Sequence, residues 1–277
     1  MKVLFIGLGS VGVRHAKIIN QFYPEYQIYA FSKTRHNISF IKDLNNWNDV
    51  EQESPNLAFI CNPTYLHINS AIQCAKMGMH LFIEKPICSS LDNLFELLNI
   101  IYKNNQTAYI AYPFRFHSGI EDKLSEILLF VHDHYSIFAK TNIEKWGKKS
   151  YSFDKKLGGG VLFELSHEID IAEWIFGKIL KITGTKERHY KYPIYSDAQL
   201  KVVHQSGIEG VLNLSLTKEF DYRSIQYNNM MYQYHANNQM YESQIKYFFE
   251  NLNNPYLMNN IFDASELFYQ IIKMENR

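Results

Sequence analysis

The sequence predicts an α/β protein with an N-terminal doubly wound parallel sheet and a C-terminal α+β domain on a mainly antiparallel sheet. Up to about residue 118, short apolar runs alternate with amphipathic stretches, as in parallel strands joined by crossover helices. After that point the alternation stops, and several strand-like runs follow one another. At 277 residues the chain is long enough for two domains, which we expect over residues 1–118 and 119–277.

The expected strands of the first domain are short and rich in Val, Ile, Leu and Phe, as in strands buried on both faces. Apolar residues at helical spacing predict the crossover helices between them. The strands are expected over 3–6, 27–31, 57–61, 80–83 and 107–111, and the helices include 11–22, 66–77 and 91–102.

The second domain is expected to begin with a helix over 120–131, a strand over 135–142 and a glycine-initiated helix over 160–176. Strands over 179–185, 198–204 and 208–216 follow, with Ser206-Gly207 as the hairpin turn between the last two. Residues 218–242 show no clear periodicity, and the segment after residue 216 looks short and irregular. Helices over 241–252 and 260–274 close the chain.

Composition narrows the range of functions. Lys and Arg together number 28, as do Asp and Glu, so no nucleic-acid or anionic-membrane partner is indicated. The three cysteines, Cys61, Cys74 and Cys88, form neither a C-x-x-C pair nor a His/Cys cluster, so neither a disulfide framework nor a metal site is predicted. With no export signal or long apolar span, we expect a cytoplasmic protein without a membrane anchor.

A glycine-rich turn follows the first strand, in the order Gly7, Leu8, Gly9, Ser10, Val11, Gly12. A lone G-x-G-x-x-G is weak evidence, but here a buried strand precedes it and a helix follows. Gly7 permits the tight turn, Gly9 lets the backbone approach a pyrophosphate, and Gly12 lets the helix pack on the strand. The N–H groups at the helix start then face the phosphates, which predicts a dinucleotide site over Gly7, Gly9, Ser10, Val11 and Gly12.

The residues after the second strand bear on the choice of dinucleotide. NAD sites place a carboxylate here to accept from the ribose 2′-hydroxyl, whereas this chain has Ser32, Lys33 and Arg35. These side chains can bind a 2′-phosphate, although Lys33 and Arg35 can also be solvated loop charges. The pattern favours NADP(H) over NAD(H).

Several local motifs follow one another in a fixed order along the chain. They are the glycine turn, Cys61 to His67, Glu84-Lys85-Pro86, Tyr112 to His117, and Gly158-Gly159-Gly160 leading to His167 and Asp170. This ordered set resembles the Gfo/Idh/MocA family of NAD(P)-dependent sugar and polyol oxidoreductases, over roughly residues 1–216, and it is far more specific than any one motif. The stretch of residues 157–170 looks most like members found among bacterial surface-sugar enzymes.

The resemblance implies a catalytic role for Lys85, at the junction of nicotinamide and substrate, and for His167, in proton transfer with the substrate oxygen. The chemistry agrees, since a hydride leaves an alcohol carbon only if the hydroxyl proton also leaves, and His titrates near neutrality. Lys85 adds a charge that stabilises a developing alkoxide. Asp170 is included with the catalytic residues, or else is a structural partner that fixes the His167 tautomer or a helix contact.

The family commonly has an Asp four residues before this His, whereas here Glu164 stands three residues before His167. On one helix either spacing leaves both side chains on the same face. We therefore place Glu164, with Lys85 and His167, among the substrate-binding residues. Arg115 is added to this group because its side chain can contact a hydroxylated or anionic substrate.

The remaining cofactor contacts are expected at the carboxyl ends of the strands over 57–61 and 80–83, where open parallel sheets bind ligands. These contacts are Asn62, Pro63, Thr64, His67, Glu84 and Lys85.

The leading functional hypothesis is hydride transfer between a nicotinamide and a sugar-like or polyol alcohol or carbonyl, in surface-sugar metabolism as one option. A sensor or regulator that binds the dinucleotide without turnover is an alternative, against which the presence of Lys85 and His167 argues. A redox-neutral lyase or glycosidase with tightly bound NAD(H) is another. The expected partner is a small sugar-like molecule. The sequence leaves open whether the chain forms a homo-oligomer.

Overall fold

The structure is a computed structural model that describes residues 1–33, 37–131, 133–147, 150–254, 257–258 and 260–276. The chain forms two compact units. The first contains residues 1–111 and 241–265, and the second contains 112–240 and 266–277. These units differ from a single boundary at residue 118, because the chain returns to the first unit at residue 241. The division of functions between domains 1–118 and 119–277 stays a prediction.

The first unit is built on a six-stranded sheet in the order β3-β2-β1-β4-β5-β6, with all neighbours parallel. Residues of β1, β4, β5 and β6 are almost all buried, which explains their continuous apolar character. The predicted doubly wound parallel sheet is confirmed. Its strands are β1 (Lys2–Ile6), β2 (Gln27–Phe31), β3 (Ile41–Leu44), β4 (Leu57–Ile60), β5 (His80–Glu84) and β6 (Ala108–Ala111).

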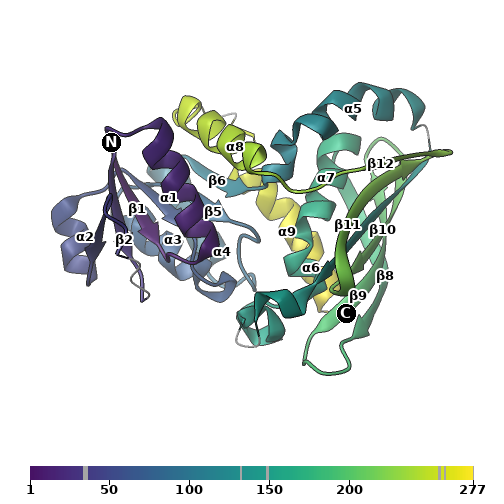
Figure 1. The fold of residues 1–277 in the computed structure, drawn as a ribbon, viewed down its shortest axis with the longest axis horizontal. Coiled ribbons are helices and arrows are strands. Elements are labelled where there is room, and N and C mark those ends of the chain that lie inside the picture. Colours follow the sequence, from purple (N-terminus) through teal and green to yellow (C-terminus); the bar gives the residue numbers. More distant parts are fainter. Residues whose placement is uncertain (34–36, 132, 148–149, 255–256, 259, 277) are drawn as a thin grey trace. The chain divides into compact units, whose positions relative to one another are not determined.

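Helices cover both faces of this sheet (Figure 1). An aromatic row fills one interface, where Phe59 stacks on Phe82 and both rings meet Phe248 of α8. The C-terminal helix α8 thus completes the core of the first unit, which local sequence patterns do not reveal. The helices are α1 (Ser10–Phe22), α2 (Trp47–Glu53), η1 (Thr64–Leu66), α3 (His67–Lys76), α4 (Leu94–Lys103) and α8 (Asn238–Glu250).

The second unit contains a mixed six-stranded sheet in the order β12-β11-β7-β10-β9-β8. Only the pair β7 and β10 is parallel among the described neighbours, so the expected mainly antiparallel sheet is confirmed. The turn through Ser206 and Gly207 joins β9 to β10 as predicted, with Gly207 at φ +87°. The strands are β7 (His134–Asn142), β8 (Ile179–Arg188), β9 (Tyr195–His204), β10 (Glu209–Ser215), β11 (Thr217–Tyr227) and β12 (Met230–Gln233).

Two sequence-based assignments are corrected here. The segment after residue 216 is not irregular, since β11 and β12 complete the second sheet, with a register shift between Thr217 and Tyr222. That shift interrupts the two-residue alternation by which a strand is recognised. The strand β3 and the helix α2, too short for a clear period, were also missed.

The predicted helix over 160–176 is two helices, α6 (Val161–Glu164) and α7 (Ser166–Phe176). The break lies at Leu165, whose ψ of 30° is not helical. The Ser166 hydroxyl donates to Phe163 O at 3.0 Å and so takes up a carbonyl that a continuous helix would use. The remaining helical segments of the second unit include η2 (Pro113–Phe116), η3 (Ile143–Trp146), η4 (Tyr151–Phe153), η5 (Lys155–Leu157) and α5 (Ser118–Phe130), and α9 (Ile261–Glu275) ends in it.

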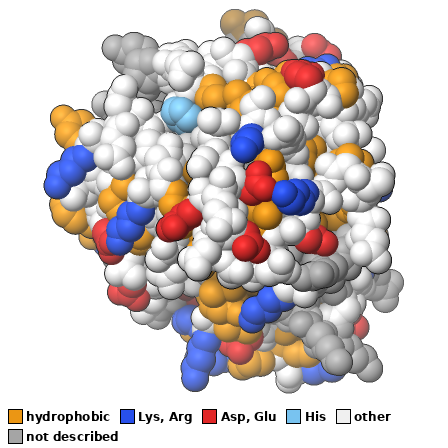
Figure 2. Space-filling model, turned by 90° about the vertical axis from the view of Figure 1, so that its left-hand side faces the viewer, with side chains coloured by type: hydrophobic (Ala, Val, Ile, Leu, Met, Phe, Trp, Pro, Cys, Tyr) orange, Lys and Arg blue, Asp and Glu red, His pale blue; other side chains and the backbone are white. Residues whose placement is uncertain are grey.

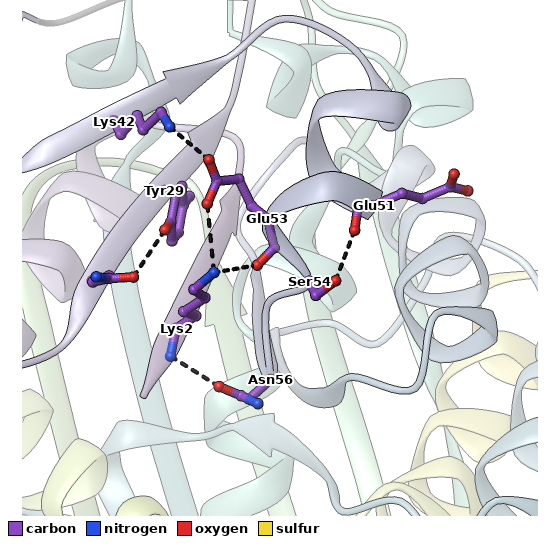
Figure 3. A network of polar contacts seen from close by, with 8 residues as sticks. Lys2, Tyr29, Lys42, Glu51, Glu53, Ser54 and Asn56 are labelled. Atoms are coloured by element: carbon purple, nitrogen blue, oxygen red, sulfur yellow. Dashed lines mark hydrogen bonds and ion pairs between the residues drawn. The ribbon is translucent and has the colours of Figure 1, made fainter.

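A polar network ties the end of α2 to the first sheet (Figure 3). Glu53 accepts from Lys42 Nζ at 2.6 Å and lies 3.5 Å from Lys2 Nζ, and the Lys42 bond is the main reason that its pKa falls to about 2. Charged side chains of both signs are interspersed on the face shown in Figure 2, in keeping with the formal net charge of zero. The Glu53 network includes Lys2, the first residue of β1, and so does not lie at the carboxyl end of that strand.

Candidate functional site

The glycine turn between β1 and α1 is fixed by backbone contacts at the carboxyl edge of the sheet. Gly7 has φ +92°, and a Cβ on it would lie 2.8 Å from the backbone of Asn62, so only glycine fits this close approach. Its N–H donates to Phe31 O at 3.1 Å, and the N–H of Leu8 donates to Ser32 Oγ at 3.2 Å. The turn is therefore held against the ends of both β2 and β4.

Gly9 and Gly12 differ in what surrounds them. A Cβ on Gly12 would lie 2.6 Å from Gly7 O and 3.3 Å from the Cβ of Cys61, which explains the glycine as a packing requirement. A Cβ on Gly9 would meet no described heavy atom within 4 Å, its chain neighbours apart, and the φ of Gly9 is −67°. The protein itself does not require glycine at position 9, so the space beside it fits a ligand that approaches the start of α1.

His67 joins the loops that follow β4 and β5. Its ring is buried, with Nε2 2.8 Å from Asn62 O and Nδ1 2.9 Å from Pro86 O. Burial lowers the His67 pKa, and the two carbonyl contacts oppose that shift. The structure thus gives His67 a role in positioning these loops, while direct contact with a cofactor stays a prediction, as it does for the buried Thr64 and the half-buried Pro63.

Asn62 and Glu84 are the polar side chains at the ends of β4 and β5. Asn62 Nδ2 donates to Ser70 Oγ at 2.8 Å, whereas its buried Oδ1 has no hydrogen-bond partner among the described residues. Glu84 Oε1 lies 2.6 Å from Nε2 of His15, a fully buried residue of α1. The next residue, Lys85, is half-buried.

His15 is a residue of this region that sequence reasoning missed. Its ring lies among Phe59, Phe82 and Tyr241, and Nδ1 is buried without a described partner. A neutral imidazole with the proton on Nε2 fits this arrangement, since it donates to Glu84 and leaves no buried N–H unmatched. The signal was a histidine on the apolar face of α1, where a buried polar side chain needs a partner.

The residues expected to select the cofactor lie just after β2. Ser32 is half-buried beside the glycine turn, and Lys33 is exposed. Arg35 lies outside the described residues. The six carboxyl-edge positions Gly7, Gly9, Ser32, Asn62, Glu84 and Lys85 thus belong to one sheet edge of the first unit.

In the second unit, α6 and α7 present two polar side chains toward solvent. Glu164 and His167 are partly exposed, whereas the other residues from 161 to 172 are buried. His167 is contacted edge-to-face by Tyr112 and Phe114, with ring centroids 6.0 and 5.2 Å away. The helix break at Leu165 does not prevent Glu164 and His167 from both reaching the surface.

Asp170 forms a two-point ion pair with Arg115. Arg115 Nε donates to Asp170 Oδ2 at 3.0 Å and its terminal nitrogen donates to Oδ1 at 2.8 Å. Asp170 is 2% exposed, and burial raises its pKa while the guanidinium opposes the rise. The geometry favours the alternative in which Asp170 is a structural partner. The contact of Arg115 with a substrate stays a prediction.

Within the described part of the chain, no group of three or more His, Cys, Asp or Glu side chains has an arrangement that could hold a metal ion. In the same residues, no helix has both the length and the apolar character needed to cross a membrane. The three cysteines are buried as free thiols, and burial raises the pKa of each.

Comparison with known proteins identifies relatives of the first unit. The model of the family GFO_IDH_MocA, described as an oxidoreductase family with an NAD-binding Rossmann fold, matches residues 1–112. Myo-inositol 2-dehydrogenase of Thermotoga maritima is 23% identical over 194 residues, which cover 64% of this chain and 55% of that protein. The 2,7-anhydro-N-acetylneuraminate hydratase of Escherichia coli is 26% identical over 190 residues, covering 63% and 49%. The chain thus spans about half the length of these two relatives.

A solved structure resembles the chain over nearly its whole length. The WlbA (WbpB) dehydrogenase from Thermus thermophilus, in complex with NAD and UDP-GlcNAcA, has a TM-score of 0.80 at 16% identity. The likeness covers 98% of this chain and 93% of that chain. At this identity the match shows a shared fold in both units.

Proposed function

Because residues 1–112 belong to the Gfo/Idh/MocA family, as the motifs predicted, we propose that the protein is an NAD(P)-dependent dehydrogenase or reductase acting on CH–OH groups. Its substrate would be a sugar-like or polyol alcohol or carbonyl, with a nucleotide-linked or acidic sugar of bacterial surfaces as the narrower class. Dinucleotide binding through the glycine turn is supported by the open space within 4 Å of a Cβ at Gly9. The domain over 1–118 would bind the cofactor, that over 119–277 the substrate, and the cytoplasm would be the location.

The proposed catalytic role rests on which residues of α6 and α7 are exposed. In a segment that is otherwise buried from residue 161 to 172, Glu164 and His167 are partly exposed, although Glu164 Oε1 and His167 Nδ1 are buried atoms. Packing alone would favour apolar residues at such positions, so two partly exposed polar side chains in this segment fit a substrate site. Lys85 is likewise half-buried at the end of β5, beside the proposed cofactor loops.

The proposed chemistry divides the work between these residues. When bound, the nicotinamide would take up a hydride from the substrate carbon, or return it in the reverse direction. His167 would accept the hydroxyl proton as the carbonyl forms and donate it in reduction. The Lys85 ammonium would stabilise negative charge on the substrate oxygen, and Glu164 would bind a neighbouring hydroxyl.

Replacement of His167 tests this proposal. We expect His167→Asn to lower turnover by about 10²-fold to 10⁴-fold while cofactor affinity changes little, because general acid–base help is lost. Lys85→Met should also impair turnover through the loss of its charge. A panel of sugars, sugar acids and nucleotide sugars, followed at the nicotinamide absorbance, supplies the substrate. Full activity of His167→Asn on that substrate would exclude the proposed role.

A redox-neutral reaction with tightly bound NAD(H) is the second candidate, and one relative named as a hydratase favours it. In that case the purified protein should hold a stoichiometric cofactor, and turnover should leave the nicotinamide absorbance unchanged. Product analysis by mass spectrometry on the same panel separates the two reactions. A sensor without turnover would bind cofactor but convert none of the compounds.

We also propose that NADP(H) is preferred over NAD(H), on the basis of Ser32, Lys33 and Arg35 in place of an acidic residue. Charge-assisted contacts to a phosphate weaken with salt, so the preference should shrink at high ionic strength and in Arg35→Ala. Titration of the unmodified protein with both dinucleotides decides the matter, and tighter NAD binding would overturn the preference.

A further inference from the structure

We propose that Arg115 and Arg223 are positioning residues that hold α7 from two sides and thereby fix the imidazole of His167. Arg115 acts through Asp170 and Arg223 acts through Glu168. The catalytic meaning of the inference rests on the function proposed above, but the positioning itself is a property of the second unit.

On one side of α7, the positioning residue Arg115 belongs to the segment Tyr112–Phe116. The same short segment supplies Tyr112 and Phe114, whose rings meet His167 edge-to-face, and Arg115, whose guanidinium makes the two-point pair with Asp170. A two-point Arg–carboxylate pair fixes orientation as well as distance. The segment therefore contacts the imidazole and, one turn further along α7, the helix that bears it.

The Arg223 side comes from β11. Arg223 Nε donates to Glu168 Oε1 at 2.8 Å, with the side chains 15% and 0% exposed. The guanidinium carbon also lies 5.3 Å from the centroid of Phe114, the ring that contacts His167. Arg223 thus contacts both Glu168 of α7 and Phe114, one of the two rings that pack against His167.

The two carboxylates flank His167 on the helix. With about 100° per residue, Glu168 lies about 100° to one side of His167 and Asp170 about 60° to the other. Rotation of α7 in either direction would stretch one of the two pairs. The partly exposed imidazole lies between these two carboxylates on the helix.

Stabilisation of the fold does not explain why Glu168 and Arg223 form an ion pair in the interior. Glu168 Oε2 is buried with no hydrogen-bond partner among the described residues, and the buried hydroxyls of Ser224 and Tyr234 likewise lack one there. Apolar side chains of similar volume often replace a buried ion pair without loss of stability. Compared with apolar pairs, the ionic pairs hold α7 in one defined position. The loss of that position in apolar variants can be measured.

The test compares paired apolar replacements with the intact protein, and uses Arg115→Lys as a milder variant that keeps the charge. The double variants are Arg223→Met with Glu168→Met, and Arg115→Met with Asp170→Leu. The control is Lys123→Met, which removes the exposed pair of Lys123 with Glu126 on α5. The readout is the ring proton resonance of His167 in histidine-labelled protein, assigned by its absence from the spectrum of His167→Asn.

Because Tyr112 and Phe114 meet the imidazole edge-to-face, the His167 resonance should be displaced by ring currents in the intact protein. We expect both double variants to melt within a few degrees of the intact protein, yet to lose at least half of that displacement. Arg115→Lys should lose part of it, and Lys123→Met none. Turnover of the double variants should fall about 10-fold to 100-fold at unchanged cofactor affinity.

An unchanged His167 resonance in the double variants would show that the aromatic packing alone holds the ring, and would overturn the inference. If the double variants do not fold, Arg115→Lys decides, and an unchanged resonance there has the same meaning. Full activity of His167→Asn would instead refute the proposed function and leave the resonance result intact.

Discussion

Gly9→Ala should weaken cofactor binding at least tenfold while leaving the fold of the first unit unchanged. The added methyl group meets no described atom within 4 Å and requires no positive φ, so the protein itself has room for it. It would occupy the space through which a pyrophosphate reaches the N–H groups at the start of α1. The variant thus separates the binding role of this glycine from its structural role.

The magnitudes follow from these contacts. Gly9 is the N-cap of α1, where Ala is less favourable than Gly by about 1 kcal/mol, and the smaller entropy of the unfolded chain offsets about 0.4–1 kcal/mol of that cost. The free energy of unfolding should therefore change by less than about 1 kcal/mol. Loss of one or two charge-assisted contacts to a phosphate, at about 1.5–3 kcal/mol each, corresponds to at least a tenfold weaker Kd.

Gly12→Ala is the matched control, because the same methyl group there would lie 2.6 Å from Gly7 O. Overpacking of this kind costs about 1–3 kcal/mol, which lowers Tm by several degrees. Thermal melting without ligand and dinucleotide titration by fluorescence should be run on both variants. Equal cofactor affinity in Gly9→Ala and in the unmodified protein would refute cofactor binding at the glycine turn. A large drop in the Tm of Gly9→Ala would show that the protein has no room for a methyl group at this position.

Two further predictions concern the partly buried acids Glu173 and Glu84. Burial raises the pKa of Glu173 to about 7, so this carboxyl is protonated in the folded state at pH values where the unfolded chain has already ionised. Its contribution to stability is present below about pH 4.5 and is lost as pH rises through 7, by at most about 3 kcal/mol. Glu173→Gln, which keeps an acceptor for the N–H of Ile179, should flatten this dependence in melts from pH 5 to 8, and an unchanged slope would contradict the assignment. His15→Phe removes the 2.6 Å contact to Glu84, so we expect a dinucleotide affinity weaker by about threefold to tenfold; unchanged affinity in titration would show that Glu84 needs no partner.

The sequence alone determined the features that depend on short stretches of chain. Five of the six strands of the first sheet, the glycine turn and the Ser206-Gly207 hairpin were predictable because side-chain periodicity and glycine conformations are local properties. The ordered motifs also pointed to the family whose model matches residues 1–112. Gly12 was assigned its packing role from the glycine motif between a strand and a helix, and the 2.6 Å approach of a Cβ to Gly7 O agrees.

Only the tertiary structure decided which distant residues meet. Arg223 lies in a segment with no readable period, 55 positions from its partner Glu168, and His15 finds Glu84 69 positions away. The return of the chain at residue 241 to fill the aromatic core of the first sheet has no local signature either. Long-range pairs of this kind depend on how separate elements pack together. The residue pattern within one segment therefore does not show which distant residue will become the partner.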